Sequence, residues 1–523
     1  MRSISILFLL VFTAGITACN HHPGENNESK DIHPVSANFK PAYFENDLRA
    51  EKIKAHEEEI HSLFAEQAKA NHLPGIAYGI VVDNELIIAS ASGVINLEDE
   101  IPATTQSSFR IASMTKSFTA MAILKLRDEG KLSICDPVEK YIPGMSAIEY
   151  LTGDSPRITI NNLLTMTAGF PEDNPWGDRQ LDEPDQMLMD LVANGFSFSN
   201  PPSYSYEYSN TGFALLGNIV SRVSGKPFQE YIKENIMTPL HMEHTYWEYN
   251  DVPGNELALG YRWENDKWKP EPMLHDGSYG SMGGLITSIE DFSKYVSFHL
   301  SAWPPRSDAD NGPVKRSTLR EMQTPQYIKL TSKSKDWNNE PCALMSGYGF
   351  GLAISTNCKG IKSVAHGGAL PGFGSKYVFY PDYGIGIMAF CNLTYAPSLP
   401  QKEIEKLLFD DKELNPRKLP VSDILDERKK QVIELIQNWN PELEDKILAE
   451  NFFLDRSREM RMSEIKEIFE KAGTIKETED IKPYNQLRGS FNMKGENGSV
   501  FVYFTLTPEK NPKVQQLYVS FDQ

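Results

Sequence analysis

The sequence predicts a mixed α/β (α+β) protein, in which helices flank an antiparallel sheet and a small α+β domain follows. Strand-like runs occur early, at 75–90, and again late, at 348–392, while helices and loops dominate the stretch between them. After a charged segment with two prolines, at 412–420, helical patterns come first and alternating strand patterns follow. Both observations favour a large domain closed by strands at its two ends and a separate small domain.

The first elements are expected to be a helix and a hairpin. Residues 47–71 carry apolar side chains at helical spacing. Two β-rich runs, at 75–82 and 86–90, then flank the polar pair Asp83-Asn84, as in a hairpin. Residues 115–128 have a helical pattern again. These segments predict a paired edge of the sheet followed by a helix.

Glycine and proline residues, which favour turns, mark the boundaries of the later elements. Four more strands are expected late in the large domain, and a helix at 401–409 ends it. We place the domain at 44–411, the linker at 412–420 and the small domain at 421–523. The expected late strands are 348–355, 362–365, 375–380 and 385–392; the small domain is expected to hold helices 423–439, 441–453 and 463–472 and strands 474–481, 487–493, 500–507 and 514–521.

Length and charge limit the classes of function. With 523 residues the chain can form more than one domain, and its net charge of −19 argues against a nucleic-acid partner. No cysteines form a C-x-x-C pair, so a zinc or redox site is not expected. We therefore expect no metal and no cofactor. Cys342 and Cys358 flank one strand-like stretch and are either paired in an oxidising compartment or buried as free thiols.

The N-terminus has the features of an export signal. Arg2 is followed by a short apolar run, too short to span a bilayer well, and small residues then precede Cys19. This arrangement resembles a bacterial lipobox, which implies a signal peptide at 1–18 and a lipid on Cys19. The polar segment 19–43 would be a tether, and the protein would sit at the bacterial cell envelope, bound to the membrane through its lipid. The alternative is an ordinary signal peptide with an incidental cysteine.

Ser113 and Lys116 are the first candidates for chemistry. A serine hydroxyl is a weak nucleophile until a neighbouring base takes its proton. At the start of a helix, a spacing of three places Lys116 on the face of Ser113, and a desolvated lysine can lose its proton near neutral pH. The same S-x-x-K spacing recurs at 332–335 and 463–466, in a polar loop and on an exposed helix face. The pair alone is therefore a weak signal.

Two further sequence elements strengthen the prediction that Ser113 and Lys116 form an active site. Tyr208-Ser209-Asn210 is the only Tyr-x-Asn in the chain and lies where a loop enters a helix. A phenol near an ammonium can relay protons with a lowered pKa, and an amide can bind a substrate carbonyl. His366-Gly367-Gly368 lies on the strand that starts at Lys362, where two glycines allow a substrate to lie against the strand edge.

In this order, the three elements resemble the serine β-lactamases and penicillin-binding proteins, nearest to their class C and D,D-carboxypeptidase branch. That family has S-x-x-K, then Y-x-N, then a K-T-G-like triplet on a strand beside the nucleophile. Three lesser segments agree with it, over a resemblance that covers 44–409. They are 163–170, with Met166 where the family usually has histidine, together with 283–292 and 371–373.

The resemblance implies a β-lactamase-like sheet with a helical subdomain and a role for each residue. Ser113 would form the acyl-enzyme, with Lys116 and Tyr208 moving protons. Asn210 would hold the substrate amide, and the N–H groups of Ser113 and Ala369 would form the oxyanion hole. His366, Gly367 and Gly368 would line the substrate, with His366 binding a carboxylate or tuning Tyr208.

His366 departs from the family pattern, which has lysine at this position. A histidine of ordinary pKa is largely neutral at neutral pH, so it is a weaker anchor for the carboxylate of a penicillin. The sequence therefore favours a serine hydrolase acting on a D-amino-acid peptide, amide or ester. A β-lactamase and a non-turnover penicillin-binding sensor are the alternatives. If His366 binds substrate, activity should vary between about pH 5.5 and 7.5.

Overall fold

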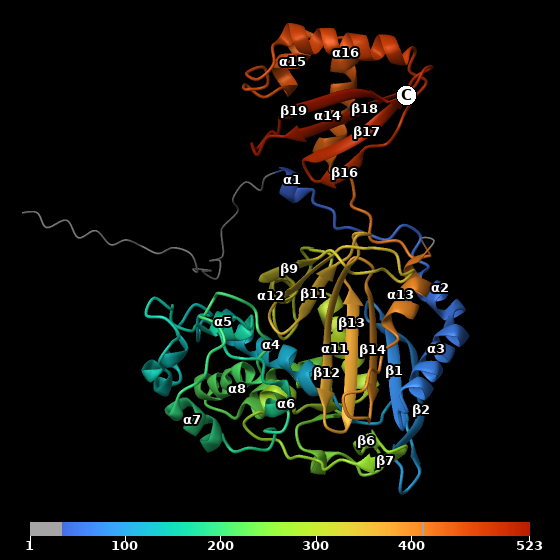
Figure 1. Ribbon diagram of the computed structural model, residues 1–523. Coiled ribbons are helices and arrows are strands. Elements are labelled where there is room, and N and C mark those ends of the chain that lie inside the picture. The colour runs from blue at the N-terminus through green and yellow to red at the C-terminus, as the bar shows by residue number, and fades with distance from the viewer. Residues whose placement is uncertain (1–33, 411–412, 523) are drawn as a thin grey trace, which may run out of the picture.

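The computed structural model describes residues 34–410 and 413–522. The larger part of the molecule is a sheet with helices on both faces, and a smaller sheet-and-helix unit lies beyond one end of it (Figure 1). The expected signal peptide and the lipid site at Cys19 lie outside the described residues. Across the described ranges, no helix combines the length and apolar character that a membrane span requires.

The large sheet is antiparallel throughout and has nine strands in the order β3-β2-β1-β14-β13-β12-β11-β10-β9. The first and last strands of the domain thus lie side by side as the third and fourth strands of the sheet, where β1 pairs with β14. The strands are β1 Gly75–Val82, β2 Glu85–Asn96, β3 Ile101–Pro102, β9 Tyr327–Thr331, β10 Leu344–Tyr348, β11 Ala353–Thr356, β12 Lys362–Leu370, β13 Phe373–Tyr380 and β14 Ile385–Cys391.

Helices cover the two faces of this sheet. On one face lie α4 (Thr115–Asp128) and α11 (Ile289–Leu300), and α11 packs directly on β1 and β14. On the other lie α2 (Arg49–Ala55), α3 (Glu57–Ala70) and α13 (Gln401–Phe409) (Figure 1). Each face has its own buried apolar cluster. Strands β1 and β14, covered on both sides, are buried along their whole length, which explains their continuous apolar sequences.

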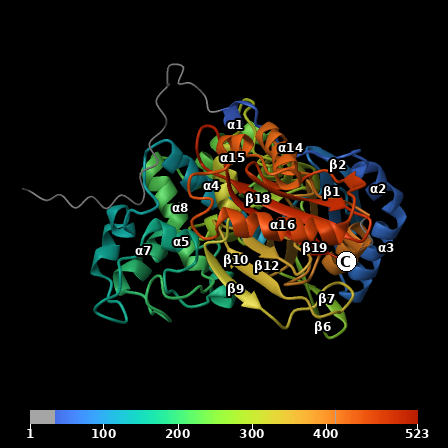
Figure 2. The ribbon, with the colours of Figure 1, turned by 90° about the horizontal axis from the view of Figure 1, so that it is seen from above.

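A helical subdomain lies to one side of the sheet, opposite α2 and α3, in both views (Figures 1 and 2). Its central helix is α8 (Asn210–Ser224), which begins after the Ser209 N-cap and ends at Gly225 in the left-handed conformation. Helix α8 packs against α4 and so fixes the subdomain to the sheet. Its other helices are α5 Ile160–Leu164, α6 Asn174–Gly177, α7 Asp185–Asn194 and α9 Phe228–Ile232.

The C-terminal unit has a five-stranded antiparallel sheet and three helices. Its buried apolar residues, from Leu425 to Leu517, form a cluster of their own. The elements are α14 Asp423–Gln437, α15 Pro441–Ile447, α16 Arg458–Ala472, β15 Glu477–Thr478, β16 Lys482–Asn485, β17 Arg488–Lys494, β18 Ser499–Leu506 and β19 Val514–Asp522.

The structure differs from the sequence expectations at several segments. The strand expected at 362–365 continues to Leu370, only Glu477–Thr478 of the strand expected at 474–481 forms a strand, and the helix expected at 463–472 begins at Arg458. The helix expected at 47–71 is broken at His56, and the strand expected at 348–355 is the hairpin of β10 and β11. Gly351, with φ of +70°, makes the turn between those strands, where apolar neighbours had hidden the reversal. The sequence pattern also missed β16 and extended α15 past its end at Ile447.

Of the two alternatives for Cys342 and Cys358, the structure shows the paired one. Cys342 and Cys358 form a disulfide between the segments that flank β10 and β11. Cys391 is a buried free thiol in β14.

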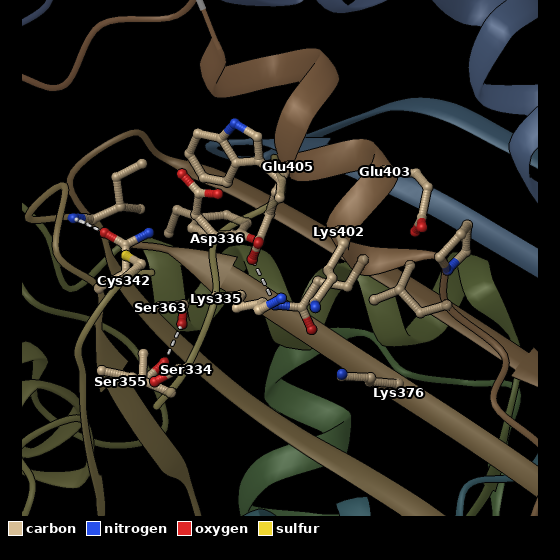
Figure 3. A pocket seen from close by; sticks show the side chains of 18 of the residues that line it. Ser334, Lys335, Asp336, Cys342, Ser355, Ser363, Lys376, Lys402, Glu403 and Glu405 are labelled. Atoms are coloured by element: carbon tan, nitrogen blue, oxygen red, sulfur yellow. Dashed lines mark hydrogen bonds between the residues drawn. The ribbon is translucent and has the colours of Figure 1, made fainter. Parts of the chain in front are cut away.

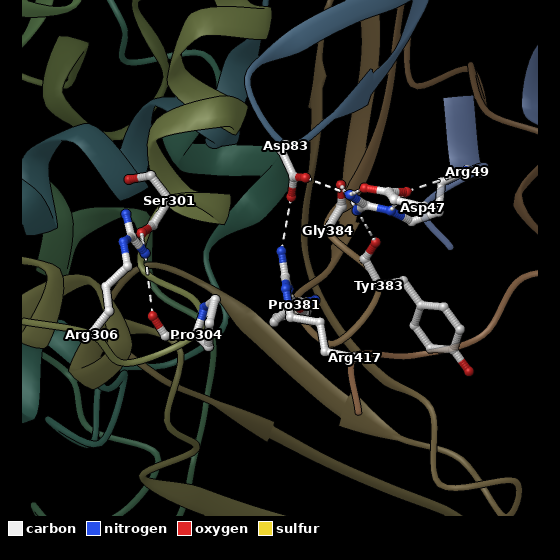
Figure 4. Close-up of polar contacts among 10 residues, drawn as sticks. All are labelled: Asp47, Arg49, Asp83, Ser301, Pro304, Arg306, Pro381, Tyr383, Gly384 and Arg417. Atoms are coloured by element: carbon white, nitrogen blue, oxygen red, sulfur yellow. Dashed lines mark hydrogen bonds and ion pairs between the residues drawn. The ribbon is translucent and has the colours of Figure 1, made fainter. Parts of the chain in front are cut away.

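Asp83 joins the N-terminal segment to the linker (Figure 4). One carboxylate oxygen accepts a hydrogen bond from Arg49 at 2.5 Å, and the other accepts one from Arg417 at 2.8 Å. The two guanidinium groups are buried, with side chains 5% and 9% exposed. Tyr43 and Lys418 pair through their backbones close by. The linker is therefore held against the turn between β1 and β2.

Candidate functional site

A cavity of about 740 Å³ lies between the sheet and the helical subdomain. Its wall contains most of the residues selected from the sequence, whereas Lys116 and Asn210 are fully buried. The lining consists of Ser113, Asn174, Pro175, Asp178, Arg179, Tyr208, His366, Gly367, Gly368, Ala369, Ser375, Tyr395, Ala396 and Pro397.

Ser113 lies in a short 3-10 helix, Ala112–Met114, directly before α4. Ala112 has a φ of +51°, a left-handed conformation that costs a non-glycine residue about 1–3 kcal/mol. The turn is held from the sheet, because the Ser375 hydroxyl donates to the Ile111 carbonyl at 2.8 Å. Strained backbone at this point places the serine side chain at the head of the helix, facing the cavity.

Strand β12 lies against this turn because Gly368 has no side chain. A Cβ at Gly368 would lie 2.1 Å from the Ile111 carbonyl oxygen, whereas one at Gly367 would meet nothing closer than 3.8 Å. Pairing of β12 with β11 ends at Ala365, while pairing with β13 continues to Leu370. The second half of β12 therefore has one unpaired edge, at the point where it borders the cavity.

Lys116 is the centre of the polar network. Its ammonium donates to Ser113 Oγ at 3.0 Å, to Asn210 Oδ1 at 2.6 Å and to the Met282 carbonyl at 3.0 Å. Burial lowers the pKa of Lys116 to about 7, although the negative charges of Asp178 and Asp173 oppose that shift. A lysine with this pKa can hold or release a proton at neutral pH.

The pKa of the Tyr208 phenol is shifted in the opposite direction to the one that the sequence predicted. Lys116 Nζ lies 4.9 Å from the centre of its ring, yet burial raises the pKa of the Tyr208 phenol well above its usual range. Contact with Ser113 opposes the rise only in part. The expected lowering by the ammonium is thus outweighed by desolvation, and the phenol keeps its proton at neutral pH.

Asn210 is the first residue of α8, and its side chain connects two opposite charges. Its carbonyl oxygen accepts from Lys116, while its NH₂ group points to Asn174 Oδ1 at 3.2 Å and Asp178 Oδ1 at 3.4 Å. An ammonium only donates and a carboxylate only accepts, so the two neighbours fix the orientation of the amide. Asp173 accepts from the N–H groups of Asn210 and Thr211 and holds the helix start in place.

His366 is buried in β12 and has a partner at each ring nitrogen. The Gly367 carbonyl lies 2.6 Å from Nδ1, and the Tyr348 hydroxyl lies 3.1 Å from Nε2. Because a carbonyl only accepts, Nδ1 carries the proton and Nε2 accepts from Tyr348. Burial, followed by the charge of Lys116, lowers the pKa of His366 to about 4. The imidazole is therefore neutral throughout the window from pH 5.5 to 7.5.

Sequence reasoning missed one corner of the cavity, formed by Asn174, Asp178 and Tyr395. Asp178 follows α6, and Tyr395 follows β14 and donates to Asp178 Oδ2 at 3.3 Å. Burial raises the pKa of Asp178 to about 6, against the attraction of Lys116. No spacing rule connects residues so far apart in the chain, and the proline-rich run around 171–178 gave no local signal.

A second cavity, of about 430 Å³, lies under the opposite face of the sheet (Figure 3). Lys376 points into it from β13, and Glu405 borders it from α13. Its wall contains none of the residues selected from the sequence. The neighbouring Ser375 lines the first cavity, because successive side chains of β13 point to opposite faces of the sheet.

The fold described above is that of the serine hydrolases related to β-lactamases and penicillin-binding proteins. The family model described as Beta-lactamase matches residues 60–409, more than half of the chain. The chain belongs to this β-lactamase family. Sequence motifs predicted the family correctly, including the antiparallel sheet flanked by helices.

Curated relatives match over a similar span. Protein flp from Staphylococcus aureus strain MW2 is 29% identical over 350 residues, which are 66% of this chain and 65% of the relative. Beta-lactamase-like protein 2 from Dictyostelium discoideum is 29% identical over 333 residues, covering 62% and 56%. The chain thus spans 65% of the first relative's length and 56% of the second's.

Solved structures share the fold at low identity. The octameric penicillin-binding protein homologue from Pyrococcus abyssi has a TM-score of 0.55 and 22% identity, covering 89% of this chain and 98% of that one. A D-stereospecific amidohydrolase from Streptomyces has a TM-score of 0.51 and 24% identity, covering 67% and 98%. A penicillin-binding protein from Bacillus halodurans also has a TM-score of 0.51 and 24% identity, covering 64% and 96%.

Proposed function

We propose that the protein is a serine hydrolase that acts through a Ser113 acyl-enzyme on a D-amino-acid peptide, amide or ester. One observation carries the proposal: in a cavity large enough for such a substrate, the nucleophile hydroxyl lies 3.0 Å from a buried lysine. The pKa of that lysine is about 7, which suits a general base at neutral pH.

The proton steps divide between two residues. Neutral Lys116 accepts the Ser113 proton as Oγ attacks the substrate carbonyl, which forms the tetrahedral oxyanion. The N–H groups of Ser113 and Ala369 stabilise that oxyanion. Tyr208, which keeps its phenolic proton, donates it to the leaving group, and Lys116 returns a proton to Tyr208. In deacylation Lys116 accepts a proton from the water that attacks the acyl carbon, the bond from that carbon to Ser113 Oγ breaks, and Lys116 returns the proton to Oγ as the acid product leaves.

The free edge of β12 supports the substrate side of the proposal. His366, Gly367, Gly368 and Ala369 lie along it, and an extended substrate can form main-chain hydrogen bonds there. A neutral His366 offers no charge for a penicillin carboxylate, which favours peptide, amide or ester substrates over β-lactams. The D-stereospecific amidohydrolase and the penicillin-binding proteins that share this fold also support the choice of a D-amino-acid peptide, amide or ester as substrate.

Turnover of paired substrates tests the proposal. D-alanine p-nitrophenyl ester, its L-isomer and a penicillin should be compared for wild type and Ser113→Ala. We expect Ser113-dependent hydrolysis of the D-ester, with slower cleavage of the L-ester and the penicillin. Faster cleavage of the penicillin would favour a β-lactamase, and a stable penicillin adduct without turnover would favour the sensor.

We also propose that the protein is anchored at the cell envelope by a lipid on Cys19, on the lipobox-like sequence alone. Metabolic labelling with an alkyne fatty acid should mark the wild type and leave Cys19→Ala unmarked. Equal labelling of both proteins would exclude this anchor.

A further inference from the structure

The missed corner of the catalytic cavity carries an unusual charge. Among the residues that line the cavity, Asp178 is the only acid, and its side chain is almost completely buried, with 3% of the residue exposed. Arg179 is also on the wall, but it is exposed, so water screens its charge. A buried carboxylate that borders a ligand cavity attracts a cation strongly.

The corner offers hydrogen-bond acceptors. Asn174 Oδ1 and both oxygens of Asp178 accept hydrogen bonds from Asn210 and Tyr395 and retain further lone pairs. The amide donor of Asn210 is already directed to Asn174 and Asp178, so it is not left free for a substrate carbonyl. The corner therefore matches a group that donates several hydrogen bonds and carries positive charge.

The reaction itself favours such a group. In the proposed mechanism Lys116 must be neutral before Ser113 attacks, and Asp178 then loses the positive charge nearest to it. A substrate ammonium would replace that charge. Ser113 and Asp178 line the same cavity, and three successive hydrogen bonds connect them through Lys116 and Asn210, so a substrate bound at Ser113 lies in the cavity that Asp178 borders.

We infer that Asp178 determines specificity and selects substrates with a free ammonium group beside the scissile carbonyl. This inference rests on the proposed function and narrows it to unacylated D-amino-acid amides and esters and to peptides cut after a D-residue with a free N-terminus. An acylated amine, as in a penicillin side chain, presents a carbonyl oxygen that the carboxylate repels.

Two substrates that differ only in this group test the inference. D-alanine p-nitroanilide and its N-acetyl derivative should be compared by kcat/KM at about pH 7, where the α-amine is largely protonated. We expect wild type to prefer the free amine by about tenfold or more, as a hydrogen-bonded charge contact provides. The ratio within one enzyme cancels changes in Lys116 basicity.

Asp178→Asn keeps the shape and removes the charge, so the preference should fall by about tenfold. Glu172→Gln is the matched control: it removes a nearby negative charge from an exposed residue outside the cavity wall, and the ratio should stay unchanged. An unchanged ratio in Asp178→Asn, or equal loss in both variants, would overturn the inference.

Wild type alone also decides the matter if the variant fails to fold. Equal or faster cleavage of the N-acetyl substrate would overturn the role of Asp178 without affecting the hydrolase proposal. If neither anilide is cleaved while a fluorophosphonate still labels Ser113, the role of Asp178 would likewise be overturned and the hydrolase proposal would stand. Absence of labelling would instead contradict the proposed function itself.

Discussion

At the scale of single residues, the catalytic proposal depends on how burial divides protons between neighbours. Desolvation lowers the pKa of Lys116 and raises that of Tyr208, because it disfavours the charged form of each. The two shifts have opposite signs and one cause. They leave a base and an acid on either side of the Ser113 hydroxyl.

The pH dependence of the reaction follows from Lys116. Below its pKa of about 7 the lysine is protonated and cannot accept the Ser113 proton, so kcat/KM for an uncharged ester should fall about tenfold per pH unit. Above about pH 8 the rate should reach a plateau. A profile flat from pH 5.5 to 8.5 would contradict the role of Lys116 as base. Asp178→Asn, which removes a charge that raises the pKa, should move the midpoint to lower pH.

His366 should not contribute to that profile. Its pKa of about 4 keeps the ring neutral from pH 5.5 to 7.5, so His366→Gln should retain the same midpoint even where the rate changes. The comparison needs the same uncharged ester and the same buffers for both proteins. Loss of the pH dependence in His366→Gln would show that the histidine, rather than Lys116, titrates.

The sequence could identify the chemical groups of the site but not their electrostatic states. Motif order selected Ser113, Lys116 and Tyr208, and the structure brings these three side chains together. The direction of the Tyr208 pKa shift and the neutral state of His366 depend on burial, which arises only when the folded chain packs around these side chains. Asp178 was missed for the same reason.

At the scale of elements, the site requires that β12 packs closely against the turn that holds Ser113. Gly368→Ala would push a Cβ against the Ile111 carbonyl, so we expect the free energy of unfolding to fall by about 1–3 kcal/mol. Fluorophosphonate labelling of Ser113 should slow with it. Urea unfolding measures the first effect, and intact mass over time measures the second.

Gly367→Ala is the control for this prediction, since a Cβ there has room. Its free energy of unfolding should stay within about 0.5 kcal/mol of wild type. Equal stability of the two variants would contradict the close packing inferred at Gly368.

Elements were predictable where local pattern and tertiary burial agree. The helix at 115–128 and the helix at 401–409 have the predicted bounds. The hairpin of β10 and β11 was not predictable, because apolar residues on both sides of Gly351 read as one strand. Turn position there is set by packing: a Cβ at Gly349 would lie 2.2 Å from the Met322 carbonyl.

At the scale of the whole molecule, Asp83 connects the linker to the large domain through Arg417. Asp83→Asn would remove the carboxylate paired with the buried Arg417 guanidinium and one of the two paired with Arg49, which keeps Asp47, so we expect a loss of about 1–3 kcal/mol in the free energy of unfolding. Trypsin should also cut the linker at 412–418 faster. Lys40→Ala, which breaks an exposed ion pair with Asp423, should change neither measurement. Unchanged linker cleavage in Asp83→Asn would contradict this anchoring role.

The most direct test of the central claim is the intact mass of the protein after exposure to a fluorophosphonate. Wild type should gain one adduct on Ser113, and the rate should rise with pH through about 7 as Lys116 loses its proton. Ser113→Ala should gain none. A wild type that stays unlabelled, or an adduct that persists in Ser113→Ala, would contradict the assignment of Ser113 as the nucleophile.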